Sequence, residues 1–388
     1  MTGRGRLIEG PDVADVALGG ALLACGGGGN PAIGRMITQR LLEEHGPVQL
    51  LPLTDLDDSA TVVAVGGVGA PSIMTEKVSS GREGIAALRM LERYIGRRAD
   101  ALIAFEAGGV NALVPMMIAS QLRLPVVDAD GMGRAFPAMQ METFSIYGVS
   151  ATPLALVGNA GNSVVVNMVD STVAERLIRQ FTIIGGGGTA YSAEHVMDGA
   201  TAKRVAVAGT IELSRALGAS LRQYRGNLPG LVATLPPVLG AAGYGAVQVL
   251  FEGKVLDVDR QVKGGYDVGL ATIQAFGDTG DRLRMEIQNE YLNAWRGDLL
   301  LATVPDLICV LDHDTVQPIT QEDLRYGQRV TVLGIEAPPL LTTDRALAVV
   351  GPGAFGMEAG FAPMAQRLRE SGLTWTDPGR AAPRAVRS

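Results

Sequence analysis

Two stretches decide the fold, Phe105-Glu-Ala-Gly-Gly-Val-Asn111 and Val126-Val-Asp-Ala-Asp-Gly-Met-Gly-Arg134. Each opens on or directly after a short apolar run, Ala101 to Phe105 in the first case and Pro125 to Val127 in the second. Each then runs into acids, amides and glycines. Open α/β sheets bind ligands at the carboxyl ends of their parallel strands. If the apolar runs are such strands, both polar clusters lie at one edge of a sheet.

The neighbouring sequence supports a parallel sheet. Strands are predicted at Val48 to Leu53 and Thr61 to Val65, and amphipathic helices at Gly84 to Tyr94 and Leu113 to Leu122. Strands that alternate with helices indicate parallel pairing through right-handed crossovers. The fold class expected for this part of the chain is therefore α/β, and its last long helix is predicted from Thr201 to Tyr224.

From about Gly245 the pattern changes to short alternating segments broken by Gly, Asp and Asn, which is typical of an antiparallel β domain. A late strand is predicted at Ala346 to Val350. We therefore expect an α/β domain over 1–240 that carries the site and a mostly β domain over 241–357. Residues 358–388 should form a C-terminal helix and a tail that is disordered from Asp377 to Ser388.

Composition excludes several function classes. The 388 residues carry a formal charge of −7 and only 5% aromatics, which disfavours nucleic acid as a partner. The start of the chain lacks a secretory signal, and its apolar runs are shorter than the ~18 residues that a membrane span needs. We therefore expect a cytoplasmic location and no membrane partner. Two cysteines and three scattered histidines (His45, His195 and His313) predict neither a disulfide framework nor a His-rich metal centre.

A glycine run follows one of the cysteines, in Cys25-Gly-Gly-Gly-Gly29. A helix is predicted before it, so a dinucleotide-binding turn, which needs a strand there, is disfavoured. Asn30 can cap the next helix, which leaves a tight turn or an anion site at that helix N-terminus. Cys25 is either a thiolate nucleophile activated by the helix or a small buried residue.

Three predicted loops at the sheet edge carry groups suited to chemistry. Carboxylates in proximity shift each other's pKa and can serve as acid and base, or they can hold a divalent metal ion such as zinc. An arginine there can pair with a substrate carboxylate, or merely with a neighbouring acid. For a single acid, helix capping is the commoner role. The residues concerned are Glu76 and Lys77, Glu106 and Asn111, and Asp128, Asp130 and Arg134.

Several of these motifs together resemble the S-methyl-thiohydantoin desulfurase-like family. The most specific is Val127-Asp-Ala-Asp-Gly-Met-Gly-Arg-Ala-Phe-Pro137. The resemblance runs from about residue 12 to 357, and the segments Gly188 to Asp198 and Leu341 to Asp344 depart from the usual pattern. The others that carry it are Cys25 to Gly29, Gly69-Ala-Pro71 with Glu76-Lys77, Glu106 to Asn111, Gly264 to Gly269, Gln288-Asn-Glu-Tyr-Leu292, Pro305 to Cys309, Leu324 to Gln328 and Val350 to Gly356.

The resemblance implies an α/β domain followed by a mostly β domain, and hydrolytic removal of sulfide or methanethiol from a thiohydantoin or a related five-membered cyclic amide. The alternatives are a non-catalytic accessory subunit of a hydantoinase or oxoprolinase partner, and a small-molecule binding protein. A homo-oligomer is also expected. The predicted catalytic residues are Cys25, Glu106, Asp128 and Asp130. The predicted substrate-binding residues are Gly27, Gly28, Glu76, Lys77, Gly108, Gly109, Asn111 and Arg134.

Overall fold

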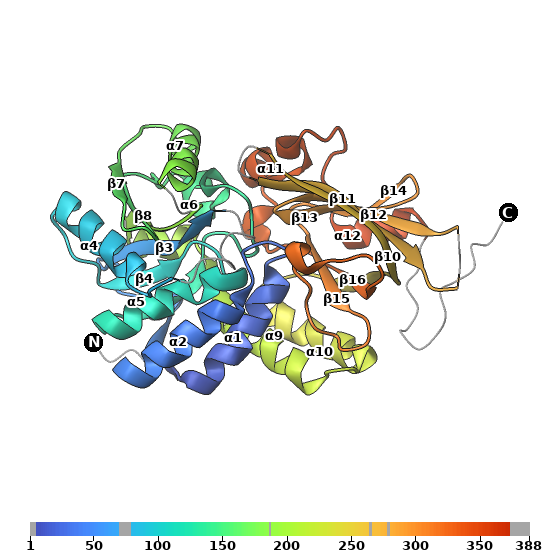
Figure 1. Cartoon of the computed structure of the whole chain (residues 1–388), viewed down its shortest axis with the longest axis horizontal. Helices are drawn as coiled ribbons and strands as arrows, with labels where there is room; N and C mark the ends of the chain where they lie inside the picture. The colour runs from blue at the N-terminus through green and yellow to red at the C-terminus, as the bar shows by residue number, and fades with distance from the viewer. Residues whose placement is uncertain (1–4, 70–78, 186–187, 264–265, 278–279, 373–388) are drawn as a thin grey trace.

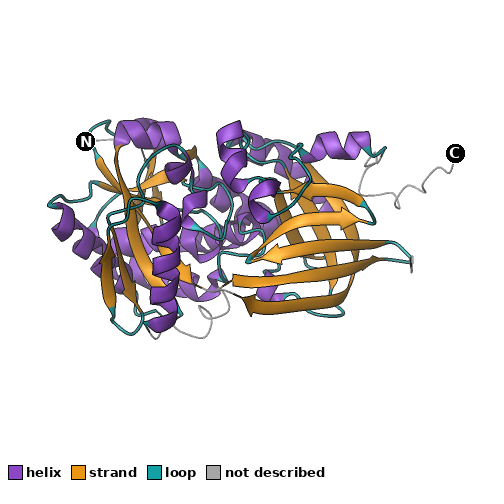
Figure 2. Ribbon diagram, turned by 90° about the horizontal axis from the view of Figure 1, so that it is seen from above, coloured by secondary structure: helices purple, strands orange, loops and turns teal. Residues whose placement is uncertain are grey.

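The computed structural model describes residues 5–69, 79–185, 188–263, 266–277 and 280–372. Two sheets organise the described chain, one flanked by helices and one curled, and Figures 1 and 2 show them side by side. No helix among the described residues is long and apolar enough to cross a membrane.

The first sheet has the order β1-β2-β5-β4-β3-β8-β6-β7, with β9 paired to β5. Strands β2, β5, β4 and β3 are parallel, whereas β1, β8, β6, β7 and β9 pair antiparallel. The strands are β1 (Arg6–Ile8), β2 (Val48–Pro52), β3 (Thr61–Gly69), β4 (Ala101–Ala104), β5 (Val126–Asp130), β6 (Leu154–Gly158), β7 (Ser163–Val166), β8 (Thr189–Asp198) and β9 (Val207–Ala208). The α/β class is confirmed, but the sheet is mixed, because β6 and β7 form a hairpin and β8 runs antiparallel to β3.

The helices of this part follow from local signals. Asn30 caps α2 as predicted, through a 2.9 Å hydrogen bond from the amide N–H of Ala32. Glu9 and Asp12 form a capping box on α1, and that helix begins at Gly10. The helices are α1 (Gly10–Leu23), α2 (Pro31–His45), α4 (Glu83–Ile95), α5 (Val114–Leu122), α6 (Thr143–Ile146), α7 (Ser171–Ile184), α8 (Gly199–Val205), α9 (Thr210–Gln223) and α10 (Leu228–Ala241).

The prediction of one helix from Thr201 to Tyr224 is wrong. The chain leaves the helical conformation after α8, pairs β9 with β5, and starts α9 after Gly209, whose φ is +76°. A left-handed residue ends a run of right-handed helix, and glycine adopts it without steric cost.

The second sheet is antiparallel throughout, as predicted, with the order β14-β13-β12-β11-β10-β16-β15. The strands are β10 (Val247–Lys263), β11 (Tyr266–Ala275), β12 (Arg282–Gln288), β13 (Glu290–Arg296), β14 (Leu299–Thr303), β15 (Leu307–Asp312) and β16 (Arg329–Ile335). Helices α11 (Asp344–Val350) and α12 (Met364–Glu370) follow. The predicted strand at Ala346 to Val350 is wrong: it is α11, capped by the Thr343 side chain. The tail Asp377 to Ser388 lies outside the described residues.

One of the hydrophobic clusters spans both sheets. Leu22 and Leu23 of α1 belong to the same buried cluster as Leu307 and Cys309 of β15. Helix α1 therefore packs on β15 and joins the two parts of the chain.

Candidate functional site

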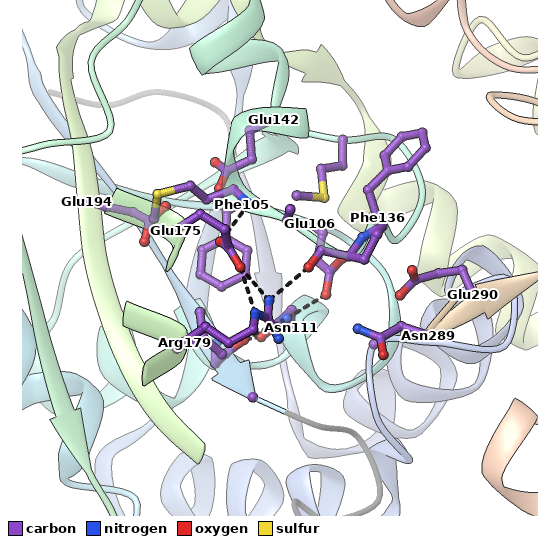
Figure 3. Close-up of a pocket in the computed structure, with 18 residues that line it drawn as sticks. Phe105, Glu106, Asn111, Phe136, Glu142, Glu175, Arg179, Glu194, Asn289 and Glu290 are labelled. Atoms are coloured by element: carbon purple, nitrogen blue, oxygen red, sulfur yellow. Dashed lines mark hydrogen bonds and ion pairs between the residues drawn. The ribbon is translucent and has the colours of Figure 1, made fainter. Parts of the chain in front are cut away.

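A small cavity of about 60 Å³ lies at the carboxyl ends of β3 and β4 (Figure 3). Its walls come from the end of β3, the loops after β4 and β5, strand β8, helix α7, the turn between β12 and β13, and the glycine loop after α1. The lining residues are Gly28, Gly67, Val68, Gly69, Phe105, Glu106, Asn111, Met132, Phe136, Pro137, Ala138, Met139, Glu142, Glu175, Arg179, Glu194, Asn289 and Glu290.

Glu106 and Asn111 form the best-ordered pair in this cavity. The Asn111 Nδ2 amide donates a 2.6 Å hydrogen bond to Oε1 of Glu106 and a 3.2 Å bond to the Gly67 carbonyl. Its Oδ1 accepts a 2.7 Å bond from the Gly67 N–H. Oε2 of Glu106 has no partner among the described residues, although the side chain is only 5% exposed. Glu106 thus presents one free carboxyl oxygen in a fixed orientation.

The surroundings of Glu106 favour its protonated form. Burial, followed by the charges of Asp130 and Cys25, raises the pKa of Glu106 to about 8, against the lowering effect of the Asn111 hydrogen bond. A carboxyl group that titrates near neutral pH can both accept and donate a proton during a reaction.

Four more glutamates surround the cavity, all 5% exposed or less. One cation lines it, Arg179 of α7, whose Nη2 lies 2.5 Å from Oε1 of Glu175. Burial and the neighbouring carboxylates raise the pKa of Glu142 and of Glu290 well above the usual range. The four are Glu142, Glu175, Glu194 and Glu290. The carboxyl groups of the cavity can therefore form hydrogen bonds with a ligand, and they disfavour an anionic one.

One group of side chains here has the composition of a metal site. Single donor atoms of Glu142, Glu194 and His195 all lie within 4.8 Å of one another. The metal trio expected from the sequence, Glu106, Asp128 and Asp130, does not form such a group within the described ranges.

Asp130 and Asp128 support the site from behind the cavity. Asp130 accepts hydrogen bonds from the N–H groups of Ala107 (2.7 Å) and Gly133 (3.0 Å), which ties the loop after β4 to the loop after β5. Burial raises its pKa to about 7. Asp128 accepts 3.0 Å bonds from two N–H groups in the first turn of α9. Neither lines the cavity, so their predicted roles as acid, base or metal ligand are not supported by their positions.

Arg134 is also placed differently from the prediction. Its guanidinium is fully buried and donates to the main-chain carbonyls of Asp306 (2.6 Å) and Tyr291 (3.2 Å) in the β domain, and to that of Ala135. It does not line the cavity. A side chain that is saturated with carbonyl partners joins the two domains and does not pair with a substrate carboxylate.

Cys25 lies outside the cavity, fully buried at the end of α1, with φ +50°. Burial raises the pKa of its thiol, but a hydrogen bond with Cys309 and the charge of Arg134 outweigh it and leave the pKa lowered. The same hydrogen bond, with burial, raises the pKa of Cys309 well above its usual value. The two thiols form a buried pair, so the position of Cys25 fits a packing role better than attack on a substrate.

The predicted glycines fall into two groups. Gly28 lines the cavity, whereas Gly27 lies beneath Glu290, so close that a β carbon at Gly27 would collide with that carboxylate. Gly108 and Gly109 pack on the glycine loop, where the N–H of Val110 donates to the Gly28 carbonyl at 3.0 Å. Glu76 and Lys77 lie outside the described residues.

Sequence reasoning missed the acidic walls of the cavity. Asn289 and Glu290 lie within the quoted motif Gln288 to Leu292, and Phe136 and Pro137 end the motif that starts at Val127, so those motifs held a usable signal. Glu142, Glu175 and Arg179 carry no signal in their spacing. Together with Glu194 and His195, they meet only through the tertiary fold.

Comparison with known proteins gives a family and a similar solved structure. The family model described as S-Me-THD-like, N-terminal domain, matches residues 11–168, and the S-Me-THD-like, C-terminal domain model matches residues 169–364. That division falls inside the first sheet, because β8 and β9 come after it. A crystal structure of a protein from Chromobacterium violaceum, a structural genomics target, is similar with a TM-score of 0.76 and 25% identity, covering 92% of this chain and 100% of that one. No curated protein matches the chain significantly.

Proposed function

Because the chain belongs to the S-Me-THD-like family, we propose that it is a hydrolase that removes sulfur from a thiohydantoin-type five-membered ring. The observation that carries the proposal is the partnerless Oε2 of Glu106 at the cavity, held in place through Asn111. Hydrolysis needs a group that takes a proton from water and later gives one to the leaving group, and a carboxyl group with a pKa of about 8 can do both.

The reaction consumes one water molecule. For an S-methyl substrate, the water oxygen bonds to the ring carbon between the two nitrogens, and Glu106 takes one of its protons. The tetrahedral intermediate then breaks its carbon–sulfur bond, the sulfur receives the proton from Glu106, and methanethiol leaves. The second water proton is lost as the ring carbonyl of the hydantoin forms, and it protonates the adjacent ring nitrogen.

The charge of the cavity favours a neutral ring as the substrate. Five buried glutamates line it, and its arginine is paired with Glu175. Carboxylate oxygens accept hydrogen bonds from ring N–H groups, whereas a substrate carboxylate would be repelled. Asn111 acts as a positioning residue, because its amide atoms are engaged by Gly67 and Glu106.

The test is turnover by the isolated full chain. S-methyl-thiohydantoin, thiohydantoin and hydantoin are incubated with the protein, and released methanethiol or sulfide is measured with a thiol reagent. We expect release from the sulfur-bearing rings. The proposal is wrong if no ring is turned over by the protein loaded with the metal ions named below. Copurification with a hydantoinase or oxoprolinase, with turnover only in that complex, would instead show an accessory subunit.

A further inference from the structure

Figure 3 shows Glu142 and Glu194 on the side of the cavity away from Glu290. His195 meets these two side chains there. Glu142 directly precedes α6, and Glu194 and His195 are consecutive in β8. All three are 1% exposed or less. Glu142 and Glu194 line the cavity, while His195 lies behind them.

The imidazole of His195 is oriented but incompletely satisfied. Its Nε2 lies 2.8 Å from Oγ of Ser145, and the ring of Phe144 packs 5.5 Å from it. Its Nδ1 lies 3.3 Å from Oε2 of Glu142 and 3.2 Å from Oε1 of Glu194. Neither contact has the geometry of a hydrogen bond, so Nδ1 and the Glu142 Oε2 atom have no hydrogen-bond partner among the described residues.

The backbone is shaped to bring these groups together. Successive side chains of a regular strand point to opposite faces. The pairing of β3 with β8 skips between Val62 and Ala64, and His195 has a φ of +41°. Such a bulge re-aims a side chain, here so that Glu194 and His195 both reach one point.

A cation would stabilise two carboxylates and an imidazole nitrogen that face one another at these distances. Bare carboxylates repel each other when they are buried together, and a buried polar atom without a partner is costly. The described cation at this cavity, Arg179, forms its ion pair with Glu175 instead. A divalent ion between the three donors would offset both costs.

We propose that Glu142, Glu194 and His195 bind one divalent transition-metal ion at the wall of the cavity. Mixed imidazole and carboxylate donors suit Zn²⁺, Mn²⁺ or Fe²⁺, whereas Ca²⁺ and Mg²⁺ favour oxygen ligands alone. The surrounding groups have the arrangement of outer ligands: Ser145 holds Nε2, which leaves Nδ1 for the metal, and Ser192 donates to the second oxygen of Glu194. Three protein ligands leave coordination positions open towards the cavity.

The site deepens the hydrolase proposal, and its catalytic role rests on that proposal. A water molecule on the ion would lie in the cavity that Glu106 lines, and a metal ion lowers the pKa of the water it binds. The metal would supply an activated water, and Glu106 would move its protons. The metal site itself stands on geometry and is tested without a substrate.

The full chain is stripped with a chelator and titrated with Zn²⁺ and Mn²⁺ by calorimetry, and metal content is measured after dialysis. Co²⁺ reports on the ligands through its visible absorption. We expect one ion per chain. His195→Gln should weaken binding by more than about 100-fold and abolish the Co²⁺ bands, and Ser145→Ala, which removes only the outer partner, by about 10–100-fold. His313→Gln, a matched histidine beside Glu252, should bind as wild type does.

Glu142→Gln covers the case in which His195→Gln does not fold, and it should also weaken binding. The inference is overturned if the stripped wild type takes up none of these ions, or if folded Glu142→Gln and His195→Gln both bind as tightly as wild type. Thiol release without metal uptake would overturn the metal site and support the hydrolase proposal. Metal uptake without turnover of any ring would support the metal site and overturn the hydrolase proposal.

Discussion

The amide of Asn111 holds the carboxyl of Glu106 at 2.6 Å and leaves the other oxygen of that carboxyl without a hydrogen-bond partner among the described residues. The same amide is anchored on both main-chain groups of Gly67 at the end of β3. Two neighbouring parallel strands thus fix the orientation of one reactive oxygen.

Glu106→Gln should lower kcat for thiol release by about 10²–10⁴-fold, the range for loss of a general acid or base. The amide keeps the shape of the side chain but cannot take a proton from water. Steady-state kinetics on S-methyl-thiohydantoin measure the effect. Glu43→Gln, on the exposed face of α2, is the control. Equal turnover in the two variants would remove Glu106 from the reaction.

Asn111→Ala should lower kcat more than it changes KM, because it releases Glu106 without removing a group that binds the ring. It also leaves buried groups of Gly67 unpaired, at a cost of about 1–3 kcal/mol in the free energy of unfolding. Kinetics and urea unfolding give the two effects separately. Asn162→Ala, in the turn between β6 and β7, is the control. A rise in KM at unchanged kcat would contradict the positioning role.

The metal-free protein should lose stability as the pH rises from about 4.5 towards 8. The folded state raises the pKa of Glu106 above its usual value, so folding favours the protonated form, and that stabilisation is complete below pH 4.5 and lost as the pH passes through 8. Asp130, with a pKa raised to about 7, acts in the same direction.

The matched variant is again Glu106→Gln, which cannot ionise. The unfolding free energy of this variant should fall less between pH 5 and pH 8 than that of the wild type. The difference between the two falls should be up to about 4 kcal/mol, at 1.36 kcal/mol per pKa unit. The carboxylates of Glu142 and Glu290 and the thiol of Cys25 also interact with Glu106, so part of the wild-type slope should remain. If the unfolding free energies of the two proteins changed in parallel with pH, ionisation of Glu106 would not destabilise the folded state.

Cys25→Ala should retain turnover within a few-fold, because the thiol faces Cys309 and does not line the cavity. The substitution removes the buried sulfur atom and its contact with Cys309, so some loss of thermal stability is expected. Activity and melting temperature are measured on the same preparation. Complete loss of activity in a folded Cys25→Ala protein would restore the covalent route through a thiolate.

Arg134→Lys should destabilise the protein by about 2–5 kcal/mol even though the charge is kept. A lysine cannot supply the planar fork of donors that serves the Asp306 and Tyr291 carbonyls, and unpaired buried carbonyls cost free energy. Urea unfolding measures the effect, with the exposed Arg35→Lys as the control. Equal stability of the two variants would show that the guanidinium contacts contribute little.

The sequence predicted the features that depend on neighbouring residues alone. The glycine and acid clusters after Phe105 and Val127 do lie at the carboxyl ends of β4 and β5, because apolar runs and turn residues are encoded locally. The prediction of a helix across Gly209 was wrong, because propensity does not reveal a strand as short as β9. The strand predicted at Ala346 was wrong because five apolar residues fit either a strand or a helix, and the cap from Thr343 favours the helix.

The acidic cavity shows where such reasoning ends. Glu142, Glu175 and Glu290 lie far apart in the sequence and belong to no shared motif. Only long-range packing brings them to one cavity. Glu194 and His195 are consecutive in β8, so in a regular strand their side chains would point to opposite faces of the sheet. Only the bulge in β8 turns both side chains to one site. In contrast, Arg134 carries a strong functional signal in sequence but serves the join between the domains.

The contact of Gly27 with Glu290 has a consequence for protein engineering. The missing β carbon on one domain makes room for a carboxylate that the other domain supplies. A chimera that takes each domain from a different member of the family would form this corner of the cavity only if both parents contribute compatible partners. Gly27 and Glu290 should therefore be exchanged as a unit, and a library that recombines the halves should be filtered on this pair first.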